Sequence, residues 1–132
     1  MKQVLTAISA LCLLTGAAQA QDAQTGSELY DMHCAVCHGE EARGGGPLAP
    51  ALILQPPNLR TLMSRHEGVF PTSRVVMRID GRDPLVAHGS PMPVYGQFFD
   101  GEDVPMKAET GQPIMTSRPV ADLVAFLEAV QE

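Results

Sequence analysis

The chain has 132 residues, of which 15 are acidic and 9 are basic, and its formal net charge is −6. A surface with this excess of carboxylates does not attract nucleic acid or anionic lipid non-specifically, so the composition argues against a nucleic-acid-binding protein. The chain has no tryptophan, two tyrosines and four phenylalanines, a small supply of aromatic side chains for a core. Its many glycines and prolines predict many loops.

The first 20 residues are typical of a cleaved signal peptide. Lys2 supplies a positive charge, an apolar run extends from Val4 to Ala18, and Ala18-Gln19-Ala20 fits a small-residue cleavage site. The run is short for a membrane span, and retention by an uncleaved anchor is the alternative. We therefore expect a signal peptide over residues 1–20, one mature domain over residues 21–132, export to the periplasm and no stable membrane insertion.

The first helix of the mature chain is expected to begin near Gly26. Thr25 and Glu28 fit the capping-box pattern, in which each side chain hydrogen-bonds to the backbone of the other residue. Gly26 lies in the first turn, where it costs about 1 kcal/mol relative to alanine, and this cost predicts the close approach of another helix. Three apolar residues recur at helical spacing and are expected to form the inner face: Leu29, Met32 and Val36.

The stretch Cys34-Ala35-Val36-Cys37-His38 has the spacing of an attachment site for c-type haem. Two cysteines at positions i and i+3 of a helical turn can each form a thioether with one vinyl group of the same porphyrin. His38 then lies where a ring nitrogen can bind the iron. A zinc site would need a second ligand pair, and no further Cys-x-x-Cys or His-x-x-x-His follows. A thioredoxin-like redox pair would follow a strand, whereas the preceding residues are typical of a helix.

A buried haem would make up for the small number of aromatic side chains. Burial of its apolar ring would contribute on the order of 10 kcal/mol. Both Cys34 and Cys37 would be used for attachment, so the mature chain keeps no cysteine for a disulfide. We therefore expect the chain without haem to be largely unfolded.

The glycine-rich sequence from Gly39 to Ala51 predicts a loop that passes close to the haem ring. A metal-bound histidine usually donates its second ring N–H to a nearby acceptor, which sets the orientation of the ring. The carbonyl oxygen of Pro47 is the expected acceptor from His38. The alternative is that the segment is only a flexible loop.

Two short helices are expected in the middle of the chain. Asn58 can cap the first, which would extend to about Arg65. The second would span Ser73 to Asp80 and end at Gly81. Its apolar side would consist of Val75, Val76 and Ile79.

Met92 is the expected second iron ligand. It lies between Pro91 and Pro93, which stiffen the backbone of an otherwise extended loop from Asp83 to Tyr95. A thioether is a soft donor that favours ferrous iron and raises the reduction potential relative to a second imidazole. Three other residues remain as alternatives for this position: Met106, Met77 and His88, the last of which would give a bis-histidine site.

The C-terminal part of the chain is expected to contain one helical turn and one long helix. The turn would span Gly96 to Phe99, with Tyr95, Phe98 and Phe99 packing near the haem edge. The polar segment from Asp100 to Met115 is predicted to have no regular structure. The last helix would be capped by Ser117, and its apolar stripe would consist of Val120, Leu123, Phe126, Leu127 and Val130.

The attachment motif and the sequence on either side of it resemble a class I c-type cytochrome. The resemblance covers essentially all of the mature region, including a terminal helix like the stretch from Asp122 to Leu127. It implies an all-α fold with three to five helices around one covalently attached haem c. It also implies that the first and last helices cross through four residues: Gly26, Tyr30, Leu123 and Phe126.

The same resemblance implies roles for two loop segments. The segment Gly46-Pro47-Leu48 would orient His38, and Met92 would be the distal iron ligand. The sequence departs from the mitochondrial relatives in two respects, because it lacks their ring of lysines and their tryptophan bonded to a haem propionate. The docking surface and the propionate contacts are therefore not carried over from these relatives.

The expected function is one-electron transfer by a soluble, monomeric carrier of the periplasm. Its redox partners would be a membrane complex or a dehydrogenase. No nucleophile–base pair or phosphate-binding loop indicates an enzyme. The first alternative is a haem-bearing subunit of a larger oxidoreductase complex. The second is a haem sensor or peroxidase-like protein with a labile sixth ligand.

Overall fold

The structure, a computed structural model of the chain, describes residues 21–83 and 92–132. The elements in chain order are α1 (Ala23–His33), α2 (Ala35–His38), the 3-10 turns η1 (Ala49–Ala51) and η2 (Ser64–His66), α3 (Thr72–Asp80), β1 (Asp103–Lys107), β2 (Pro113–Ser117) and α4 (Arg118–Ala129). The expected signal peptide and the alternative iron ligand His88 lie outside the described residues. The described part is mostly helical.

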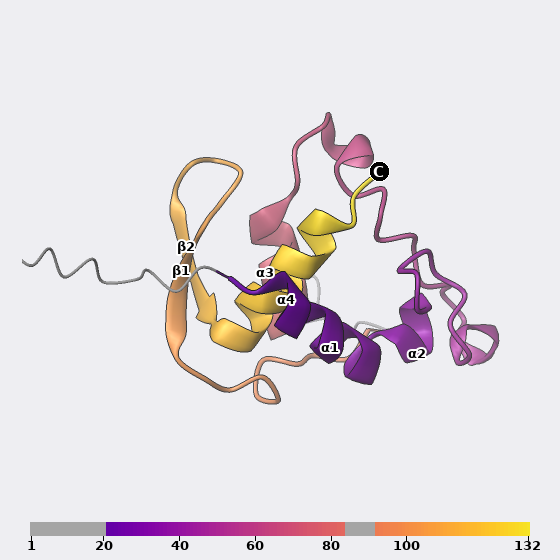
Figure 1. Ribbon diagram of the computed structural model, residues 1–132. Helices are drawn as coiled ribbons and strands as arrows, with labels where there is room; N and C mark the ends of the chain where they lie inside the picture. Colours follow the sequence, from indigo (N-terminus) through magenta and orange to yellow (C-terminus); the bar gives the residue numbers. More distant parts are fainter. Residues whose placement is uncertain (1–20, 84–91) are drawn as a thin grey trace, which may run out of the picture.

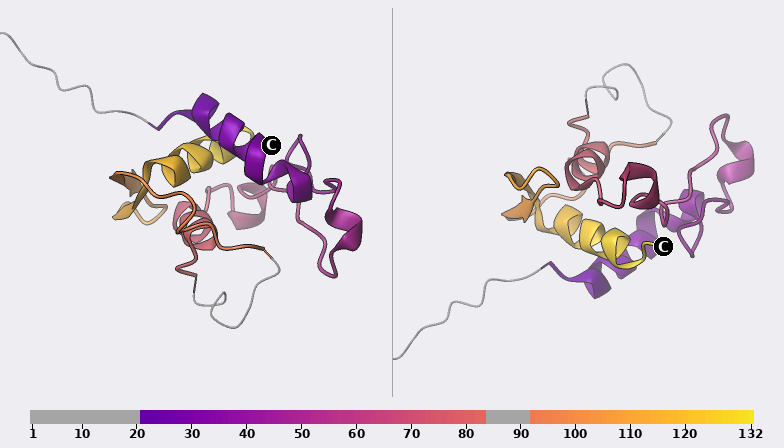
Figure 2. Two further views of the ribbon diagram at one scale, coloured as in Figure 1. Left: turned by 90° about the horizontal axis from the view of Figure 1, so that it is seen from below. Right: turned by 90° about the horizontal axis from the view of Figure 1, so that it is seen from above.

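Helix α4 lies in the middle of the fold, with α1 on one side and α3 on the other (Figures 1 and 2). The hairpin of β1 and β2 lies at one end of α4, and the loops between α2 and α3 lie at the other end (Figure 1). The largest fully buried side chains come mainly from α3 and α4, namely Val76, Val120, Leu123 and Val124. This arrangement leaves α2 beside the loop end of the molecule.

Helices α1 and α4 cross at Gly26. A side chain at this position would collide with the backbone carbonyl of Asp122, so only glycine lets the two backbones come this close. A Cβ there would also lie 3.0 Å from the backbone nitrogen of Leu123. One turn later, the rings of Tyr30 and Phe126 pack with their centroids 5.1 Å apart. The predicted contact between the first and last helices is therefore confirmed.

Helix α1 begins earlier than predicted, at Ala23. Its N-cap is Asp22, whose carboxylate accepts hydrogen bonds from the backbone amides of Gln24 and Thr25 at 2.9 and 3.3 Å. The backbone amide of Asp22 in turn donates to the carboxylate of Asp122 at 2.8 Å. Thr25 is not the cap because Asp22 both caps the helix and joins its start to α4.

The buried face of α1 also differs from the prediction. Gly26 and Tyr30 are buried, whereas Met32 and Val36 are 65% and 46% exposed. Leu29 packs partly against the core. The first helix has more than one set of side chains at helical spacing, and the close approach at Gly26 decides which set faces α4.

Helix α3 agrees with the prediction apart from its first residue, Thr72. It ends at Gly81, which adopts the left-handed conformation with a φ of 86°. Its predicted apolar residues are buried: Val75, Val76 and Ile79. Its N-terminus is capped from a distance, because the backbone amide of Ser73 donates to the carboxylate of Glu109 at 2.9 Å. This bond joins α3 to the connection between β1 and β2.

The segment from Asp100 to Met115 contains regular structure, contrary to the prediction. Strands β1 and β2 pair antiparallel, with Val104 opposite Thr116 and Met106 opposite Ile114. Val104 and Met106 are buried while their neighbours in β1 are exposed, the period-two pattern of a half-buried strand. This alternation was the signal in the sequence from which strand β1 could have been predicted. The fold is therefore mostly helical with a small two-stranded sheet, rather than all-α.

Helix α4 follows Ser117, as predicted, and has Pro119 in its first turn. The Ser117 side chain does not cap the helix, because its buried hydroxyl has no hydrogen-bond partner among the described residues. Three residues of the predicted apolar stripe are buried, namely Val120, Leu123 and Leu127, while Phe126 and Val130 are partly buried. The three buried side chains pack in the hydrophobic core.

The α-helix predicted from Asn58 to Arg65 is replaced by turns and by the short η2. Asn58 does cap a turn, because its side-chain oxygen accepts from the backbone amide of Arg60 at 2.9 Å. The backbone amide of Met63 then donates to the side chain of Gln131 at 2.9 Å. A tertiary hydrogen bond therefore takes the place of a helical one in this segment.

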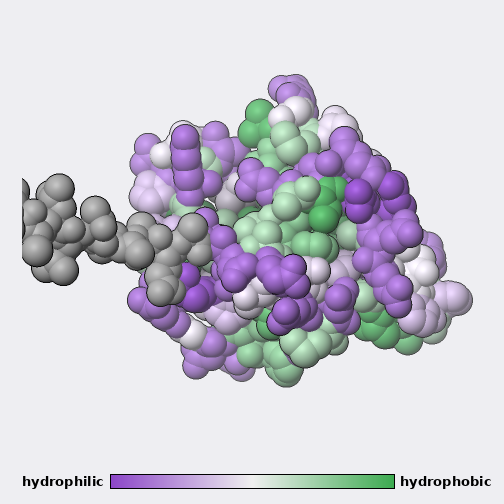
Figure 3. Space-filling model, viewed as in Figure 1, coloured by the Kyte–Doolittle hydropathy of each residue, from purple (hydrophilic) through white to green (hydrophobic). Residues whose placement is uncertain are grey.

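Much of the face seen in Figure 3 is hydrophilic, with hydrophobic residues gathered near its centre over the C-terminal half of α4. No helix in residues 21–83 and 92–132 is long and apolar enough to cross a membrane. Large apolar side chains are also exposed on the loop that follows α2, namely Leu48, Ile53 and Leu54. These side chains add an apolar area beside the attachment motif.

Candidate haem-attachment site

Cys34 joins the two N-terminal helices. Its backbone amide donates to the carbonyl of Tyr30 at 2.8 Å, which ends α1, and its own carbonyl accepts from the amide of His38 at 2.9 Å, which closes α2. Helix α2 is a single turn that contains Cys37 and His38. Both cysteines and the histidine therefore share one short helical stretch of backbone.

The thiols of Cys34 and Cys37 are both free and partly buried. Burial raises the pKa of Cys34 to about 12, and the neighbouring Cys37 adds to this rise because two thiolates would repel each other. Cys34 is therefore a neutral thiol at physiological pH. Two reduced thiols this close to each other are the groups required to form two thioethers with one porphyrin.

His38 is buried, with 9% of its surface exposed. Burial lowers the pKa of this imidazole, and its contact with Pro57 only partly offsets the effect. The Nδ1 atom lies 3.5 Å from the carbonyl oxygen of Pro57. Because a carbonyl oxygen only accepts, this contact places the proton on Nδ1 and leaves a lone pair on Nε2. A neutral imidazole with a free Nε2 is a metal-binding form of histidine.

The acceptor that faces His38 differs from the sequence-based prediction of Pro47. It is Pro57, in a segment that runs beside Ala42 because the amide of Leu59 donates to the Ala42 carbonyl at 2.8 Å. The sequence alone does not show whether Pro47 or Pro57 supplies the acceptor for His38, since each lies in the irregular stretch that follows the motif. The pairing of Leu59 with Ala42 holds this segment beside the motif, and the Pro57 carbonyl oxygen thereby lies near the His38 ring.

The glycine-rich loop that carries Pro47 packs on the backbone of α2. Its amides donate three hydrogen bonds of 2.7–3.0 Å to carbonyls of that helix: Gly44 to His38, Gly46 to Cys37 and Leu48 to Val36. A side chain at Gly46 would approach the carbonyl oxygens of Ala35 and Val36 to 2.5 and 2.6 Å, which is too close. These contacts hold the loop against the motif.

The segment after Met92 is tied to the motif through Tyr95. The Tyr95 hydroxyl donates to the carbonyl oxygen of His33 at 3.0 Å, and the Tyr95 amide donates to the carbonyl of Ile79 at 2.9 Å. Burial raises the pKa of Tyr95, and both motif cysteines contribute, so the phenol lies near their thiols. Sequence reasoning used only the aromatic character of Tyr95 and missed the role of its hydroxyl.

Aromatic side chains gather around His33, the residue before the first cysteine. Its ring centroid lies 4.9 Å from that of Phe98 and 5.2 Å from that of Phe99, both in edge-to-face geometry. The backbone of the predicted turn is present, because the amides of Phe98 and Phe99 both donate to the Tyr95 carbonyl. The position of these rings at a haem edge stays a prediction.

Met92 is partly buried and packs against the hydrophobic core. It is the first described residue after the stretch 84–91, so Pro91 lies outside the described residues. Of the alternative ligands, Met106 is 6% exposed and fills the core beneath β1, and Met77 is half-buried on α3. Ligation of iron by Met92 stays a prediction.

The donors at the motif fit a covalently attached haem. Two free thiols and one neutral imidazole lie on one short stretch of helix, with apolar core residues beside them. Within the described ranges, no three His, Cys, Asp or Glu side chains are grouped so that they could hold a metal ion. The motif therefore offers one protein nitrogen to a metal, together with two sulfurs for a covalent attachment.

The comparison with protein families gives a match to the family described as Cytochrome c, over residues 23–131. Curated proteins and solved structures gave no match. Members of the matched family bind covalently attached haem c, typically one haem, and use it for electron transfer. The matched range runs from the first residue of α1 to beyond the end of α4. The chain therefore belongs to the cytochrome c family.

Proposed function

We propose that this protein is a soluble one-electron carrier of the periplasm, with haem c joined to Cys34 and Cys37 and with His38 and Met92 as iron ligands. The observation that carries the proposal is the state of His38. Its ring is buried and neutral, and its Nδ1 faces a carbonyl oxygen, which leaves Nε2 for a metal. The bound haem supplies the redox chemistry, a change of iron between the ferric and ferrous states.

The chain's own residues hold this group in one position. Cys34 and Cys37 anchor it to the junction of α1 and α2, and that junction is tied to α4 through the crossing at Gly26. The thioether of Met92 favours the ferrous state relative to a second imidazole. With His38 and Met92 as the two protein ligands, the haem would have no position left for a substrate, so the chemistry it would supply is electron transfer rather than catalysis.

The location and partners follow from the N-terminal residues and the charge. The pattern of residues 1–20 supports export through a cleaved signal peptide, and attachment of haem c would follow in the periplasm. Loss of Lys2 with the signal peptide leaves the mature chain with 8 basic and 15 acidic residues, a net charge of −7. This charge favours a redox partner with a basic docking surface, because complementary charges speed the encounter of two proteins.

The absorption spectrum of the oxidised holoprotein tests the ligand set. We expect a near-infrared sulfur-to-iron band that is absent from Met92→Ala. Met115→Ala is the matched control, because Met115 is about half-exposed on β2 and its loss should leave the band intact. A band that persists in Met92→Ala would refute ligation by Met92. Rapid binding of carbon monoxide to the reduced wild type at neutral pH would instead support a sensor or peroxidase-like protein.

One observation favours a second candidate, a haem-bearing subunit of a larger oxidoreductase. The loop after α2 exposes Leu48, Ile53 and Leu54, and the side chain of Gln55 stabilises its shape by donating to the carbonyls of Ala49 and Leu52 at 3.1 and 3.0 Å. The haem ring would cover part of this apolar surface, and the remainder would suit a permanent interface. Gel filtration of native extract separates the two functions, because a free carrier elutes at its monomer mass and a subunit elutes with its enzyme.

A further inference from the structure

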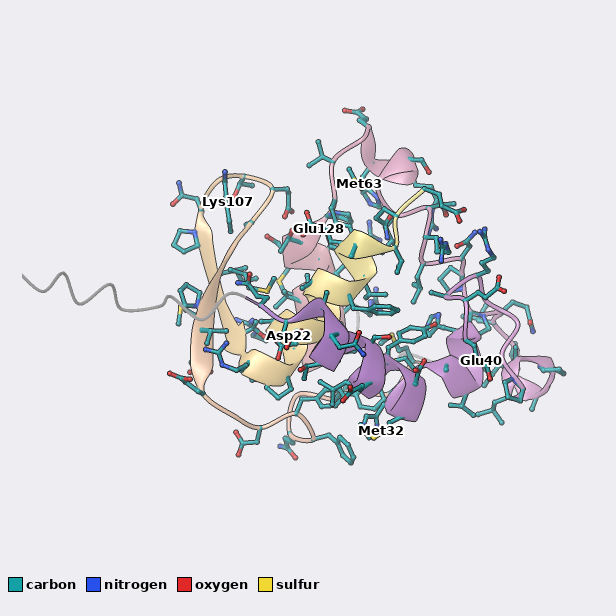
Figure 4. All side chains as sticks on the ribbon, viewed as in Figure 1. Asp22, Met32, Glu40, Met63, Lys107 and Glu128 are labelled. Carbon is teal, nitrogen blue, oxygen red and sulfur yellow. The ribbon has the colours of Figure 1, made fainter. Side chains whose placement is uncertain are left out.

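The two residues at 131 and 132 fold back onto the segment that carries Pro57. The side-chain Nε2 of Gln131 donates to the carbonyl oxygens of Leu59 and Leu127 at 2.8 and 2.6 Å. Its Oε1 accepts from the backbone amide of Met63 at 2.9 Å. Figure 4 shows Met63 beside the C-terminal end of α4. Gln131 therefore joins the last turn of α4 to both ends of the stretch 59–63.

Glu132 adds two ion pairs to this connection. Its carboxylate accepts from Nε of Arg60 at 2.7 Å and from the guanidinium of Arg43, and its backbone amide donates to the Arg60 carbonyl at 2.9 Å. An exposed ion pair by itself contributes little stability. Here one carboxylate bridges two arginines that lie before and after Pro57 in the chain, so it limits the movement of the segment between them.

Leu59 is held through both of its backbone groups. Its amide donates to the Ala42 carbonyl at 2.8 Å, and its carbonyl accepts from Gln131 at 2.8 Å. Ala42 belongs to the loop that is hydrogen-bonded to α2, and Gln131 belongs to the end of α4. Pro57 lies two residues before Leu59 in the chain, so these bonds restrict where its carbonyl oxygen lies relative to His38.

We propose that Gln131, supported by Glu132, is a positioning residue for His38. It holds the carbonyl oxygen of Pro57 at Nδ1 of the imidazole and thereby sets the reduction potential of the haem. Gln131 acts through the backbone of Leu59, and its side chain hydrogen-bonds to Leu59, Met63 and Leu127. The inference rests on the proposed ligation of iron by His38.

The direction of the effect follows from the chemistry of the imidazole. A hydrogen bond donated by Nδ1–H raises the basicity of the ring, and a more basic ligand stabilises ferric iron more than ferrous iron. Without Gln131 the Pro57 carbonyl moves more freely and the hydrogen bond weakens. The ferric state then loses stabilisation, so the reduction potential rises.

The test compares Gln131→Met with Gln112→Met in the holoprotein. Both variants replace an amide by an apolar side chain of similar length, and Gln112 is exposed in the connection between β1 and β2, away from the residues that Gln131 bonds. We expect Gln131→Met to raise the reduction potential measured by spectroelectrochemistry. Gln131→Met also removes the bond to the Leu59 carbonyl, so we expect the Leu59 amide to exchange with deuterium about fivefold faster, the factor that corresponds to about 1 kcal/mol. Gln112→Met should match the wild type in both measurements.

A second pair of variants keeps the inference testable if Gln131→Met does not fold. Glu132→Ala removes both ion pairs, and Glu128→Ala removes an equal charge from an exposed position on α4. We expect a higher potential for Glu132→Ala than for Glu128→Ala. Equal potentials within each folded pair, with an unchanged His38 ligand spectrum, would overturn the inference. A wild-type spectrum without a histidine ligand would overturn the proposed function instead.

Discussion

The hydroxyl of Tyr95 donates a hydrogen bond of 3.0 Å to the carbonyl oxygen of His33, the residue before the first cysteine of the motif. This bond links the chain that follows Met92 to the end of α1. The Tyr95 amide makes a second link, to the Ile79 carbonyl on α3. Tyr95 therefore connects the segment of the proposed distal ligand both to the attachment motif and to the core.

Replacement of Tyr95 by phenylalanine should loosen the segment that carries Met92. We expect Tyr95→Phe to lower the free energy of unfolding by about 1 kcal/mol, the typical loss for one hydrogen bond. We also expect added imidazole to displace Met92 from iron faster, because the segment has lost its bond to His33. Denaturant unfolding and stopped-flow absorption measure the two effects.

Tyr30→Phe is the matched control for this prediction. It removes the other tyrosine hydroxyl, which donates to the Gly39 carbonyl at 2.7 Å. It should lower the free energy of unfolding by a similar amount and leave the rate of imidazole binding unchanged. Equal acceleration by the two variants would contradict a specific role for Tyr95.

Gly26→Ala should destabilise the crossing of α1 and α4. Alanine favours a helix over glycine by about 1 kcal/mol, so local propensity alone predicts a gain in stability. The new Cβ would collide with the Asp122 carbonyl, and overpacking of this kind costs about 1–3 kcal/mol. We expect a net loss in the free energy of unfolding, measured by thermal or denaturant unfolding. Glu28→Ala, at an exposed position of α1, should change stability little, and a stable Gly26→Ala would disprove the close crossing.

The cap that Glu109 supplies to α3 should depend on pH. Burial alone would raise the pKa of Glu109, but hydrogen bonds from Ser73 and the nearby His66 bring it below its ordinary value of 4.5. A lowered pKa in the folded state means that this group stabilises the fold above about pH 4.5 and that the stabilisation is lost as the pH falls through the lower folded-state value.

Glu109→Gln measures this contribution. At pH 7 the variant should have a free energy of unfolding lower by about 0.5 kcal/mol, the low end of the range for helix caps, because Glu109 is exposed. At pH 3 the difference between wild type and variant should shrink, since the wild-type carboxylate is protonated there. Urea unfolding at the two pH values checks this, and a difference that grows at low pH would contradict the hydrogen bond to Ser73.

Removal of the haem attachment should show how far the fold depends on the cofactor. In a Cys34→Ser, Cys37→Ser double variant, acid-acetone should extract the pigment, which it should not do from the wild type. The haem-free chain should be largely unfolded by circular dichroism, because burial of the ring contributes on the order of 10 kcal/mol. Cooperative unfolding of a colourless, helical chain would contradict this expectation.

Features that depend on spacing along one stretch of chain could be predicted from the sequence. The motif from Cys34 to His38, the end of α3 at Gly81 and the need for glycine at Gly26 are of this kind. The first two follow from the geometry of a single helical turn or from one backbone conformation. The third follows from the cost of a glycine inside a helix, which a close contact with another helix explains. Local sequence therefore contains the information that these features need.

The hairpin of β1 and β2 could be predicted from the sequence only in part. The alternation of Val104 and Met106 with exposed neighbours was present in the sequence, but polar and turn-forming residues around it obscured a pattern only five residues long. Pairing of β1 with β2 and burial of one face against α4 made the strands stable. A two-stranded sheet needs such a partner surface, so its sequence signal is weak by itself.

The sequence by itself contained the haem-attachment motif, argued against membrane-spanning and nucleic-acid-binding classes, and predicted which helices cross. Only the tertiary structure decided which distant groups pair: Pro57 with His38, Glu109 with Ser73 and Gln131 with Leu59. Many carbonyls, carboxylates and amides in the chain have the same bonding capacity. The path of the backbone between them selects one pair, and that path depends on packing of the whole molecule rather than on any local pattern.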